Sequence, residues 1–149
     1  MTILSIDPGA NGGFAFRNEK GVVSEKLPET EGDINLMIEM FSVNGAGVCY
    51  LEELVRYAGT NMPSSAMAVY AANWGFLKGV LMARGWRIIL VRPQKWQKAL
   101  SLGVSDGNKT LWKNHLKTRA QQLYPGIKVT LANADALLIL RYAELEERV

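Results

Sequence analysis

Short apolar runs and amphipathic stretches take turns along the chain, and this pattern predicts a mixed α/β fold. Five runs rich in β-forming residues predict strands at 3–7, 14–17, 22–26, 48–54 and 86–91. Apolar positions at helical spacing predict helices at about 33–42, 64–84, 93–100, 108–124 and from 133 onward. A meander of three strands, followed by strands that alternate with helices, is typical of a mixed five-stranded sheet with helices on both faces.

The helix predicted from Ser64 to about Arg84 carries small residues at every fourth position. Ser64 is the expected N-cap, and the stripe consists of Ala71, Gly75 and Gly79. Two glycines inside a helix destabilise it by about 1 kcal/mol each relative to alanine, so close packing against another backbone has to compensate. We expect the stripe to pack on the chain's own sheet, and the alternative is a subunit interface. Further apolar area at such an interface would come from Tyr70, Trp74 and Phe76.

Carboxylates stand at the ends of two predicted strands and at the start of the last helix. They are Asp7, Glu52 with its neighbour Glu53, and Asp135. A carboxylate beside a buried strand is unfavourable unless a cation or several N–H donors compensate it. Adjacent strand residues point to opposite faces, so only one of the two glutamates can share the site, and we assign Glu52. Turn formation by Asp7 and helix capping by Asp135 are the structural alternatives.

The ligand types restrict the metal that such a cluster could hold. Carboxylate oxygens without Cys or His select Mg²⁺ or Mn²⁺. The single cysteine and single histidine also exclude a Cys/His zinc site. If the first and fourth strands are neighbours, their ends meet, and the last helix can bring the third carboxylate to them. Two ions about 4 Å apart would stabilise the attacking and leaving oxygens of a phosphodiester displacement, so the pattern predicts a nuclease.

Glycines follow the first carboxylate closely. Gly12 and Gly13 remove two side chains just beyond the turn at Pro8-Gly9. Their absence lets a phosphate or another stretch of backbone approach, and the sequence leaves both possibilities open.

The net charge of +3 hides an asymmetry along the chain. Residues 1–53 hold nine acidic and three basic side chains, whereas residues 84–128 hold ten basic ones and a single acid, Asp106. The basic segment is interleaved with Trp86, Trp96 and Trp112, which is typical of a nucleic-acid interface, although a solvated basic helix would look similar. The lysines expected to contact DNA phosphates are Lys95 and Lys98, followed by Lys109, Lys113 and Lys117 in an i, i+4, i+8 row.

Length and composition favour one domain over residues 1–149. The apolar fraction is 48%, which is enough for a core of its own. Cys49 lies inside an apolar run and has no internal disulfide partner, so we interpret it as a core residue in a reducing compartment. No apolar run approaches the roughly 18 residues of a membrane span, and no signal peptide is recognisable. We therefore expect a cytoplasmic protein.

Taken together, these motifs resemble RuvC-type Holliday junction resolvases, which belong to the ribonuclease H-like superfamily. Three segments resemble the active-site segments: Ile3 to Gly9, Tyr50 to Glu53 and Ala134 to Ile139. Others are similar to phage and chloroplast resolvases of that type: Gly75 to Gly85, Val91 to Trp96 and Gln122 to Gly126. The resemblance implies that Asp7, Glu52 and Asp135 bind two Mg²⁺ or Mn²⁺ ions. It also implies a homodimer that makes paired nicks in branched DNA, in a bacterial or phage-infected cell.

One position departs from the bacterial pattern. That pattern has a further acid three residues before the final aspartate, where this chain has Ala132. Water, Asn133 or Glu53 could complete the coordination shell. The second metal could instead be held weakly, or activity could be reduced.

Three other functions share parts of this pattern. An actin-like or sugar-kinase-like nucleotide-binding module also begins with a strand, an aspartate and glycines, but it usually needs two such domains. A catalytically weak or inactive DNA-binding protein would keep the fold and lose an acid, as at Ala132. A nuclease acting on flaps or on RNA would keep the whole site, because the fold does not fix the substrate.

Overall fold

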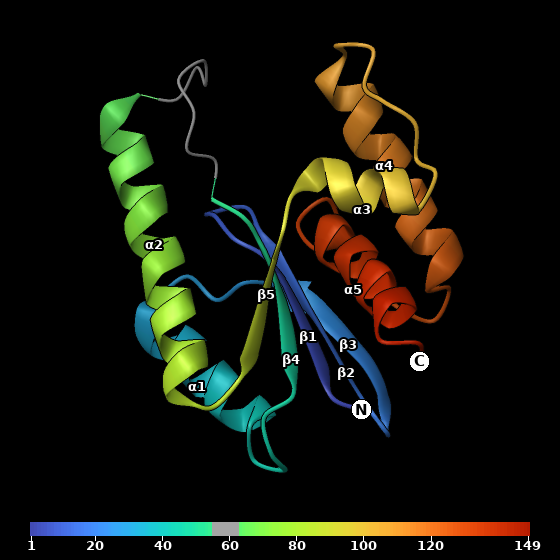
Figure 1. Ribbon diagram of the computed structural model, residues 1–149. Helices are drawn as coiled ribbons and strands as arrows, with labels where there is room; N and C mark the ends of the chain where they lie inside the picture. The colour runs from blue at the N-terminus through green and yellow to red at the C-terminus, as the bar shows by residue number, and fades with distance from the viewer. Residues whose placement is uncertain (55–62) are drawn as a thin grey trace.

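The computed structural model describes residues 1–54 and 63–149, and in it two layers of helices enclose one sheet (Figure 1). The strands are β1 (Ile3–Asp7), β2 (Gly13–Asn18), β3 (Gly21–Lys26), β4 (Val48–Glu52) and β5 (Arg87–Val91). The helices are α1 (Glu31–Phe41), α2 (Ser64–Ala83), α3 (Pro93–Ala99), α4 (Lys109–Leu123) and α5 (Ala134–Glu146). These elements confirm the mixed α/β fold predicted from the sequence.

The sheet brings the ends of β1 and β4 together. Its strand order is β3-β2-β1-β4-β5, with β1, β2 and β3 antiparallel and with β4 and β5 parallel to β1. Ile6 of β1 is paired with Leu51 of β4. One residue further along the same register, Asp7 falls beside Glu52, so both carboxylates lie at one edge of the sheet.

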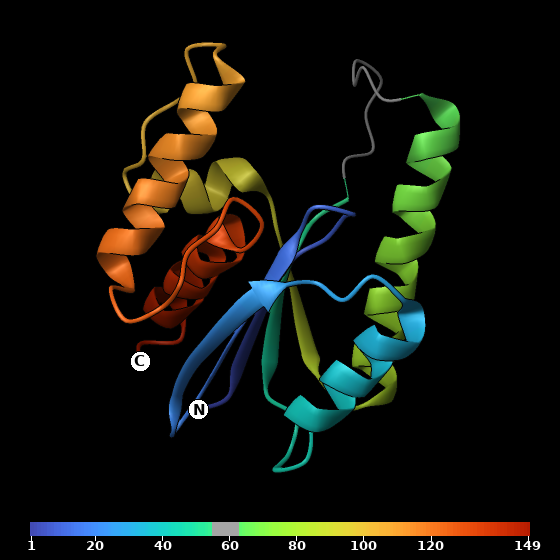
Figure 2. The ribbon, with the colours of Figure 1, turned by 180° about the vertical axis from the view of Figure 1, so that it is seen from behind.

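Each face of the sheet has its own hydrophobic cluster. Helices α1 and α2 cover one face, and α3, α4 and α5 cover the other (Figure 2). In α5, residues 137–140 are fully buried, because the helix lies between the sheet and α4. A helix that is apolar on nearly all sides needs such neighbours, and α5 is therefore held firmly against β1.

The start of the long helix differs from the prediction. Helix α2 begins at Ser64 itself, and Pro63 occupies the N-cap position without a side-chain hydrogen bond. Proline next to a helix start favours this arrangement because its φ angle is already set. The sequence also predicts a polar loop at 56–63 before this helix, and residues 56–62 lie outside the described residues.

The glycine stripe does not pack on the sheet, so that expectation is wrong. A Cβ atom added at Gly75 or Gly79 would find no described atom within 4 Å. The helix instead buries Trp74, Leu77 and Leu81 against the sheet, at i, i+3 and i+7. The stripe faces outward because the large side chains occupy the inward face.

Two tryptophans of the basic segment are core residues, so the aromatic part of the nucleic-acid prediction is wrong for Trp86 and Trp96. Trp86 is 4% exposed and Trp96 is fully buried, while Trp112 packs partly buried on the cluster under α4. Burial of large aromatic area outweighs any surface role in these positions. Cys49 is buried as predicted. No helix in the described part of the chain has the length and hydrophobicity needed to cross a bilayer.

Candidate active site

The alternation of side chains along β1 and β4 decides which carboxylates share a face. Ile3 and Tyr50 belong to the cluster under α5, and Ser5 donates a hydrogen bond of 2.6 Å to the carbonyl oxygen of Ala136 in α5. Because side chains alternate along a strand, the residues two positions after Ser5 and Tyr50 lie on this same face. These residues are Asp7 and Glu52.

Glu53 takes the opposite direction. Its Oε2 atom accepts a hydrogen bond of 2.9 Å from Nε of Arg92, at the end of the neighbouring strand. The pairing gives Glu53 a cation of its own, outside the face that Asp7 and Glu52 share. The geometry therefore agrees with the choice of Glu52 as the strand residue of the site.

Asp135 joins the two strand carboxylates from the first turn of α5. Burial raises the pKa of Asp135 to about 6 and that of Glu52 to about 7, and the charge of Asp135 contributes to the rise at Glu52. Burial also raises the pKa of Asp7 well above its ordinary value, with further increases from the charges of Glu52 and Asp135. The three carboxylates are close enough to act on one another, so a nearby cation would stabilise their ionised forms.

A lysine from α4 reaches the same place. Lys113 lowers the pKa of both Asp7 and Asp135, against the effect of burial. These three side chains border a cavity of about 220 Å³, whose other lining residues are Pro8, Asn11, Gly12, Leu131 and Ala134. Lys113, the middle lysine of the row predicted on α4, therefore lies beside the predicted acidic site.

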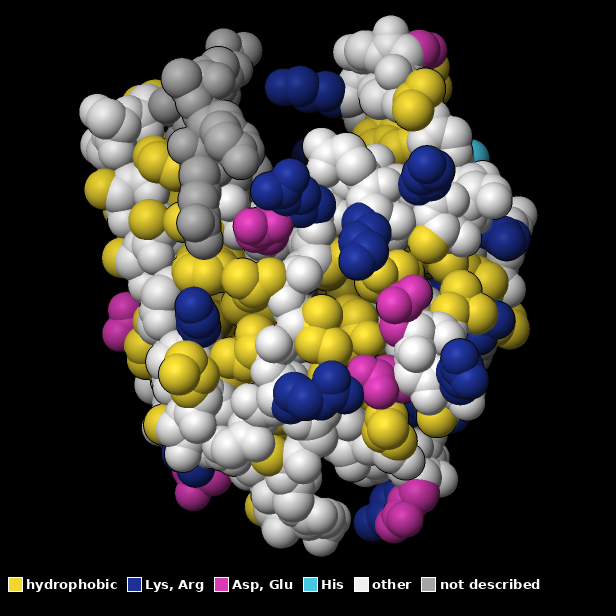
Figure 3. Space-filling model, in the orientation of Figure 1, with side chains coloured by type: hydrophobic (Ala, Val, Ile, Leu, Met, Phe, Trp, Pro, Cys, Tyr) yellow, Lys and Arg dark blue, Asp and Glu magenta, His cyan; other side chains and the backbone are white. Residues whose placement is uncertain are grey.

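The remaining lysines of the prediction lie on the helices α3 and α4. Lys109 is exposed and Lys117 is partly buried on α4, and Lys95 and Lys98 are exposed on α3. In Figure 3, dark blue side chains border the notch at the top of the molecule, on the side of α3 and α4. A basic rim beside an acidic centre is suited to a polyanion whose backbone must come close to the carboxylates.

The glycines after Asp7 are required by close backbone packing. A Cβ atom on Gly12 would collide with the carbonyl oxygen of Asp7, and one on Gly13 with the carbonyl oxygen of Ala132. Of the two possibilities left open by the sequence, the close approach of backbone is the one observed. This packing fixes the turn of β1 against the start of α5.

Two of the three groups considered as replacements at Ala132 are already engaged. The Oδ1 atom of Asn133 accepts a hydrogen bond of 2.8 Å from the backbone of Thr130, and its Nδ2 donates to the carbonyl oxygens of Ser24 and Lys128. Asn133 is 1% exposed, occupies the N-cap position of α5 and makes no side-chain bond to that helix. Glu53 is paired with Arg92, as described above. The amide of Asn133 is thus fully engaged, and Glu53 is directed to Arg92, away from the face that Asp7 and Glu52 share.

The donor set suits a hard divalent cation. Three carboxylates with raised pKa values provide only oxygen ligands, the type that Mg²⁺ and Mn²⁺ prefer. Within the described ranges, no three Asp, Glu, His or Cys side chains converge on one point as a finished metal site. Mutual repulsion between the carboxylates favours such separation, so binding a metal ion would require these side chains to move toward one another.

The sequence did not indicate two aromatic neighbours of this site. Nε1 of the buried Trp96 donates a hydrogen bond of 3.4 Å to Oε2 of Glu52, although the sequence had suggested that α3 presents this tryptophan outward. Tyr70 of α2 packs near Gly9, and burial raises its pKa to about 12, with further increases from the charges of Glu52 and Asp7. The only signal for Trp96 is its place between Lys95 and Lys98 on a short helix.

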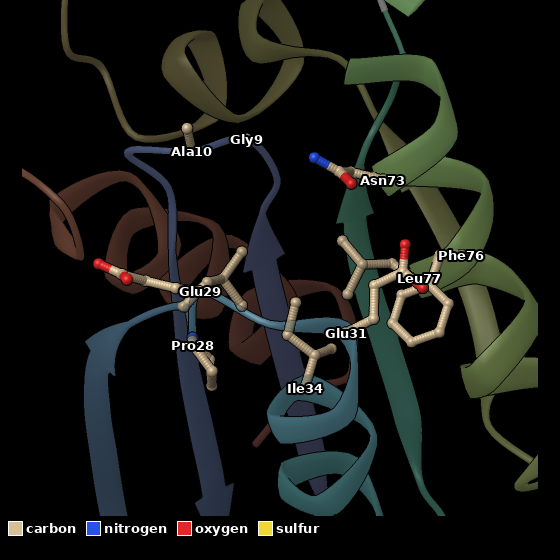
Figure 4. A pocket seen from close by; sticks show the side chains of 10 residues that line it. Gly9, Ala10, Pro28, Glu29, Glu31, Ile34, Asn73, Phe76 and Leu77 are labelled. Carbon is tan, nitrogen blue, oxygen red and sulfur yellow. The ribbon is translucent and has the colours of Figure 1, made fainter. Parts of the chain in front are cut away.

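A second cavity lies on the other side of the turn after β1. It measures about 250 Å³ and is bordered by the turn, by the segment that enters α1, and by α1 and α2 (Figure 4). Asn73 projects from α2 toward Gly9 and Ala10, while Ile34 and Leu77 line the apolar part. Its acidic lining residues, Glu29 and Glu31, make it unsuited to a DNA phosphate.

The fold resembles that of two solved RuvC structures. The chain is similar to a solved structure described as "Thermus thermophilus RuvC structure", with a TM-score of 0.60, 16% identity, and coverage of 98% of this chain and 97% of that one. It is also similar to "T. thermophilus RuvC in complex with Holliday junction substrate", with a TM-score of 0.56, 17% identity, and coverage of 97% and 96%. No protein-family model matches the sequence, and no curated protein matches it. The likeness confirms the RuvC-type, ribonuclease H-like fold expected from the motifs.

Proposed function

We propose that this chain is a Mg²⁺-dependent endonuclease that cuts branched DNA, with four-way junctions as its main substrate. The observation that carries the proposal is the meeting of Asp7, Glu52 and Asp135 on one face at the ends of β1, β4 and α5. The solved complex of a structurally similar protein with a Holliday junction supports the choice of substrate.

The three carboxylates would hold the metal, and Mn²⁺ could replace Mg²⁺. Two bound ions would supply Lewis acidity at the scissile phosphate and stabilise the charge that develops on the attacking and leaving oxygens. Asp7 ends the central strand of the sheet and lies beside Glu52 in the register of β1 and β4, while its charge interacts with those of Glu52 and Asp135. We assign it the role of shared ligand. Lys113, on the wall of the same cavity, would hold a phosphate oxygen of the DNA.

The other lysines would position the DNA arms. Lys95 and Lys98 lie on α3 and Lys109 and Lys117 on α4, the helix that brings Lys113 to the cavity, and their contacts to phosphates would add affinity without sequence preference. Because their contacts are electrostatic, binding should weaken as the salt concentration rises.

The enzyme would act as a homodimer. A four-way junction has two-fold symmetry, so two related subunits could nick it symmetrically in one encounter. The outward glycine stripe of α2 supports this arrangement, because Gly75 and Gly79 leave room for a second backbone. Val69 and Met82 on the same helix are 62% and 63% exposed and would add apolar contact. Trp74 cannot contribute as expected, because it is buried against the sheet.

A second candidate is a DNA-binding protein of the same fold with little or no catalytic activity. Ala132 favours it, because this position lacks the further acid of the bacterial pattern, the amide of Asn133 is engaged, and Glu53 is directed to Arg92 on the other face. The two candidates predict the same binding to DNA and differ only in cleavage.

A gel assay with labelled substrates separates these functions. The purified protein is incubated with a synthetic four-way junction, a flap and an RNA/DNA hybrid, each with Mg²⁺ and with a chelator. We expect paired, symmetric nicks in the junction only when Mg²⁺ is present. Preferred cutting of the flap or the hybrid would overturn the junction assignment. Binding to the junction without any cutting, in Mg²⁺ and in Mn²⁺, would favour the inactive candidate.

A further inference from the structure

Glu52 is held at both of its ends by tryptophan side chains from two different helices. Nε1 of Trp74, in α2, donates a hydrogen bond of 3.0 Å to the backbone carbonyl oxygen of Glu52. Nε1 of Trp96, in α3, donates one of 3.4 Å to the carboxylate oxygen Oε2. The two helices cover opposite faces of the sheet, so the residue is fixed from both sides.

The contact from Trp96 is built into the core. Trp96 is fully buried in the cluster formed by α3, α4 and α5, and Oε2 of Glu52 is the acceptor that its indole N–H meets. A buried N–H group without an acceptor is unfavourable, and within the described part of the chain no buried side-chain polar atom lacks a partner. The indole therefore favours those rotamers of Glu52 that keep Oε2 directed toward α3.

We infer that Trp96 is a positioning residue, which orients the Glu52 carboxylate so that its other oxygen, Oε1, serves the metal site. This inference rests on the proposed function, in which Glu52 is a ligand. Hydrogen bonds to ligating carboxylates commonly fix their orientation and strengthen metal binding. Trp96 thus restricts the Glu52 side chain before the metal binds, so less conformational freedom is lost on binding.

The position of α3 gives the contact a further consequence. Trp96 points inward, while its neighbours Lys95 and Lys98 on the same short helix are exposed and proposed to contact DNA. A phosphate held by these lysines would restrain the helix that orients Glu52. DNA binding and metal binding would then favour the same arrangement of α3.

Removal of the indole N–H tests the role. In Trp96→Phe, the Mg²⁺ concentration needed for half-maximal cleavage should rise about 10- to 100-fold, the range typical of groups that orient a metal ligand. The matched control is Trp86→Phe, because Trp86 is also buried and donates a hydrogen bond of 2.9 Å, but to Oγ of Ser42 outside the site. A benzothienylalanine at position 96 keeps the size of the ring without the N–H and guards against a folding defect of the phenylalanine variant. An unchanged Mg²⁺ requirement in the benzothienylalanine protein would overturn the inference.

A spectroscopic readout separates this inference from the proposed function. The full chain is labelled with 5-fluorotryptophan and titrated with Mg²⁺ without DNA, and each fluorine resonance is assigned from its loss in a single Trp→Phe variant. The Trp96 resonance should shift with Mg²⁺ while the Trp86 resonance stays in place. A shift in a protein that cuts no junction would support the positioning role and refute the proposed nuclease. Cleavage by the wild-type protein without any shift at Trp96 would retain the nuclease and refute the positioning role.

Discussion

Carboxylates lie at both ends of helix α5, with Glu144 near its C-terminal end and a set of three at its N-terminal end, and their surroundings differ. Near the C-terminal end, Glu144 is 6% exposed and accepts from Arg17 at 3.0 Å, from Arg141 at 3.2 Å and from the hydroxyl of Tyr124 at 3.1 Å. At the N-terminal end, Asp135 meets Asp7 and Glu52, and within the described residues none of these three forms an ion pair.

The difference shows which carboxylates are structural. A buried charge is stable when a partner of opposite charge and suitable hydrogen bonds compensate it, and Glu144 has both. The N-terminal set has raised pKa values, and among the described residues Lys113 is the cation that acts on two of its members. Groups arranged in this way reduce the stability of the fold, so their presence is better explained by a function than by packing.

The largest effect on cleavage is expected when one carboxylate is removed from the N-terminal set. In Asp7→Asn, Mg²⁺-dependent junction cleavage should fall by more than about 100-fold, because loss of a ligand should exceed the 10- to 100-fold effect typical of groups that merely orient one. Binding to the junction should persist, since the lysines are unchanged. Cleavage rates are measured in single-turnover gels and binding by mobility shift. Cleavage as fast as that of the wild type would contradict the assignment.

The second test uses pH. The raised pKa values of Glu52, about 7, and Asp135, about 6, mean that the folded protein holds these protons more tightly than the unfolded chain does. The contribution of these groups to the free energy of unfolding should therefore be largest at low pH and fall as the pH rises from about 4 to 7, by roughly 5 kcal/mol. Urea unfolding in a chelating buffer measures it. Asp135→Asn should flatten the dependence, whereas Asp106→Asn, at an exposed loop position, should leave it unchanged.

The sequence could predict the N-terminal set because its signals are local. Strand ends, side-chain alternation and the first turn of a helix all depend on near neighbours, and they led to the choice of Asp7, Glu52 and Asp135, whose role as metal ligands stays a prediction. The contact between Trp96 and Glu52 could not be predicted in this way. It depends on where α3 packs across the sheet, which no local pattern specifies.

The same limit explains two wrong predictions. Gly75 and Gly79 were expected to face the sheet because glycine allows close packing, but Trp74 and Leu77 bury more apolar area and direct the helix the other way. Tryptophans among lysines were expected at a DNA surface, yet Trp96 is fully buried while the lysines around it are exposed. In both cases the size of the apolar side chains decided the orientation.

Replacing Glu144, the buried carboxylate near the C-terminal end of α5, should lower the stability of the protein and leave cleavage unchanged. Glu144→Ala removes the hydrogen bonds to Arg17, Arg141 and Tyr124 and should lower the free energy of unfolding by about 2 kcal/mol, the range for hydrogen bonds to a charged group. Junction cleavage per folded molecule should stay the same. Thermal unfolding and single-turnover cleavage are measured on the same preparation. Loss of cleavage without a loss of stability would mean that Glu144 has a functional role too.

The smallest effect is expected at Glu53, and measuring it tests the choice of Glu52 over its neighbour. Glu53→Gln removes the ion pair with Arg92, which is partly exposed, and should change stability by less than about 1 kcal/mol. Its cleavage rate should stay within a few-fold of the wild type, whereas Glu52→Gln should lose nearly all activity. If Glu53→Gln were the inactive variant, the wrong residue of the pair would have been assigned.

The central claim is that the N-terminal set binds a divalent cation, and thermal unfolding in a series of Mg²⁺ concentrations tests it most directly. A ligand that binds only the folded state raises the melting temperature, and the rise grows with the logarithm of the ligand concentration above the dissociation constant. At pH 8 without DNA, the melting temperature of the wild type should rise with Mg²⁺, and so should that of Asp106→Asn. In Asp7→Asn the rise should be lost. Equal responses in all three proteins, or no response in any, would contradict the claim.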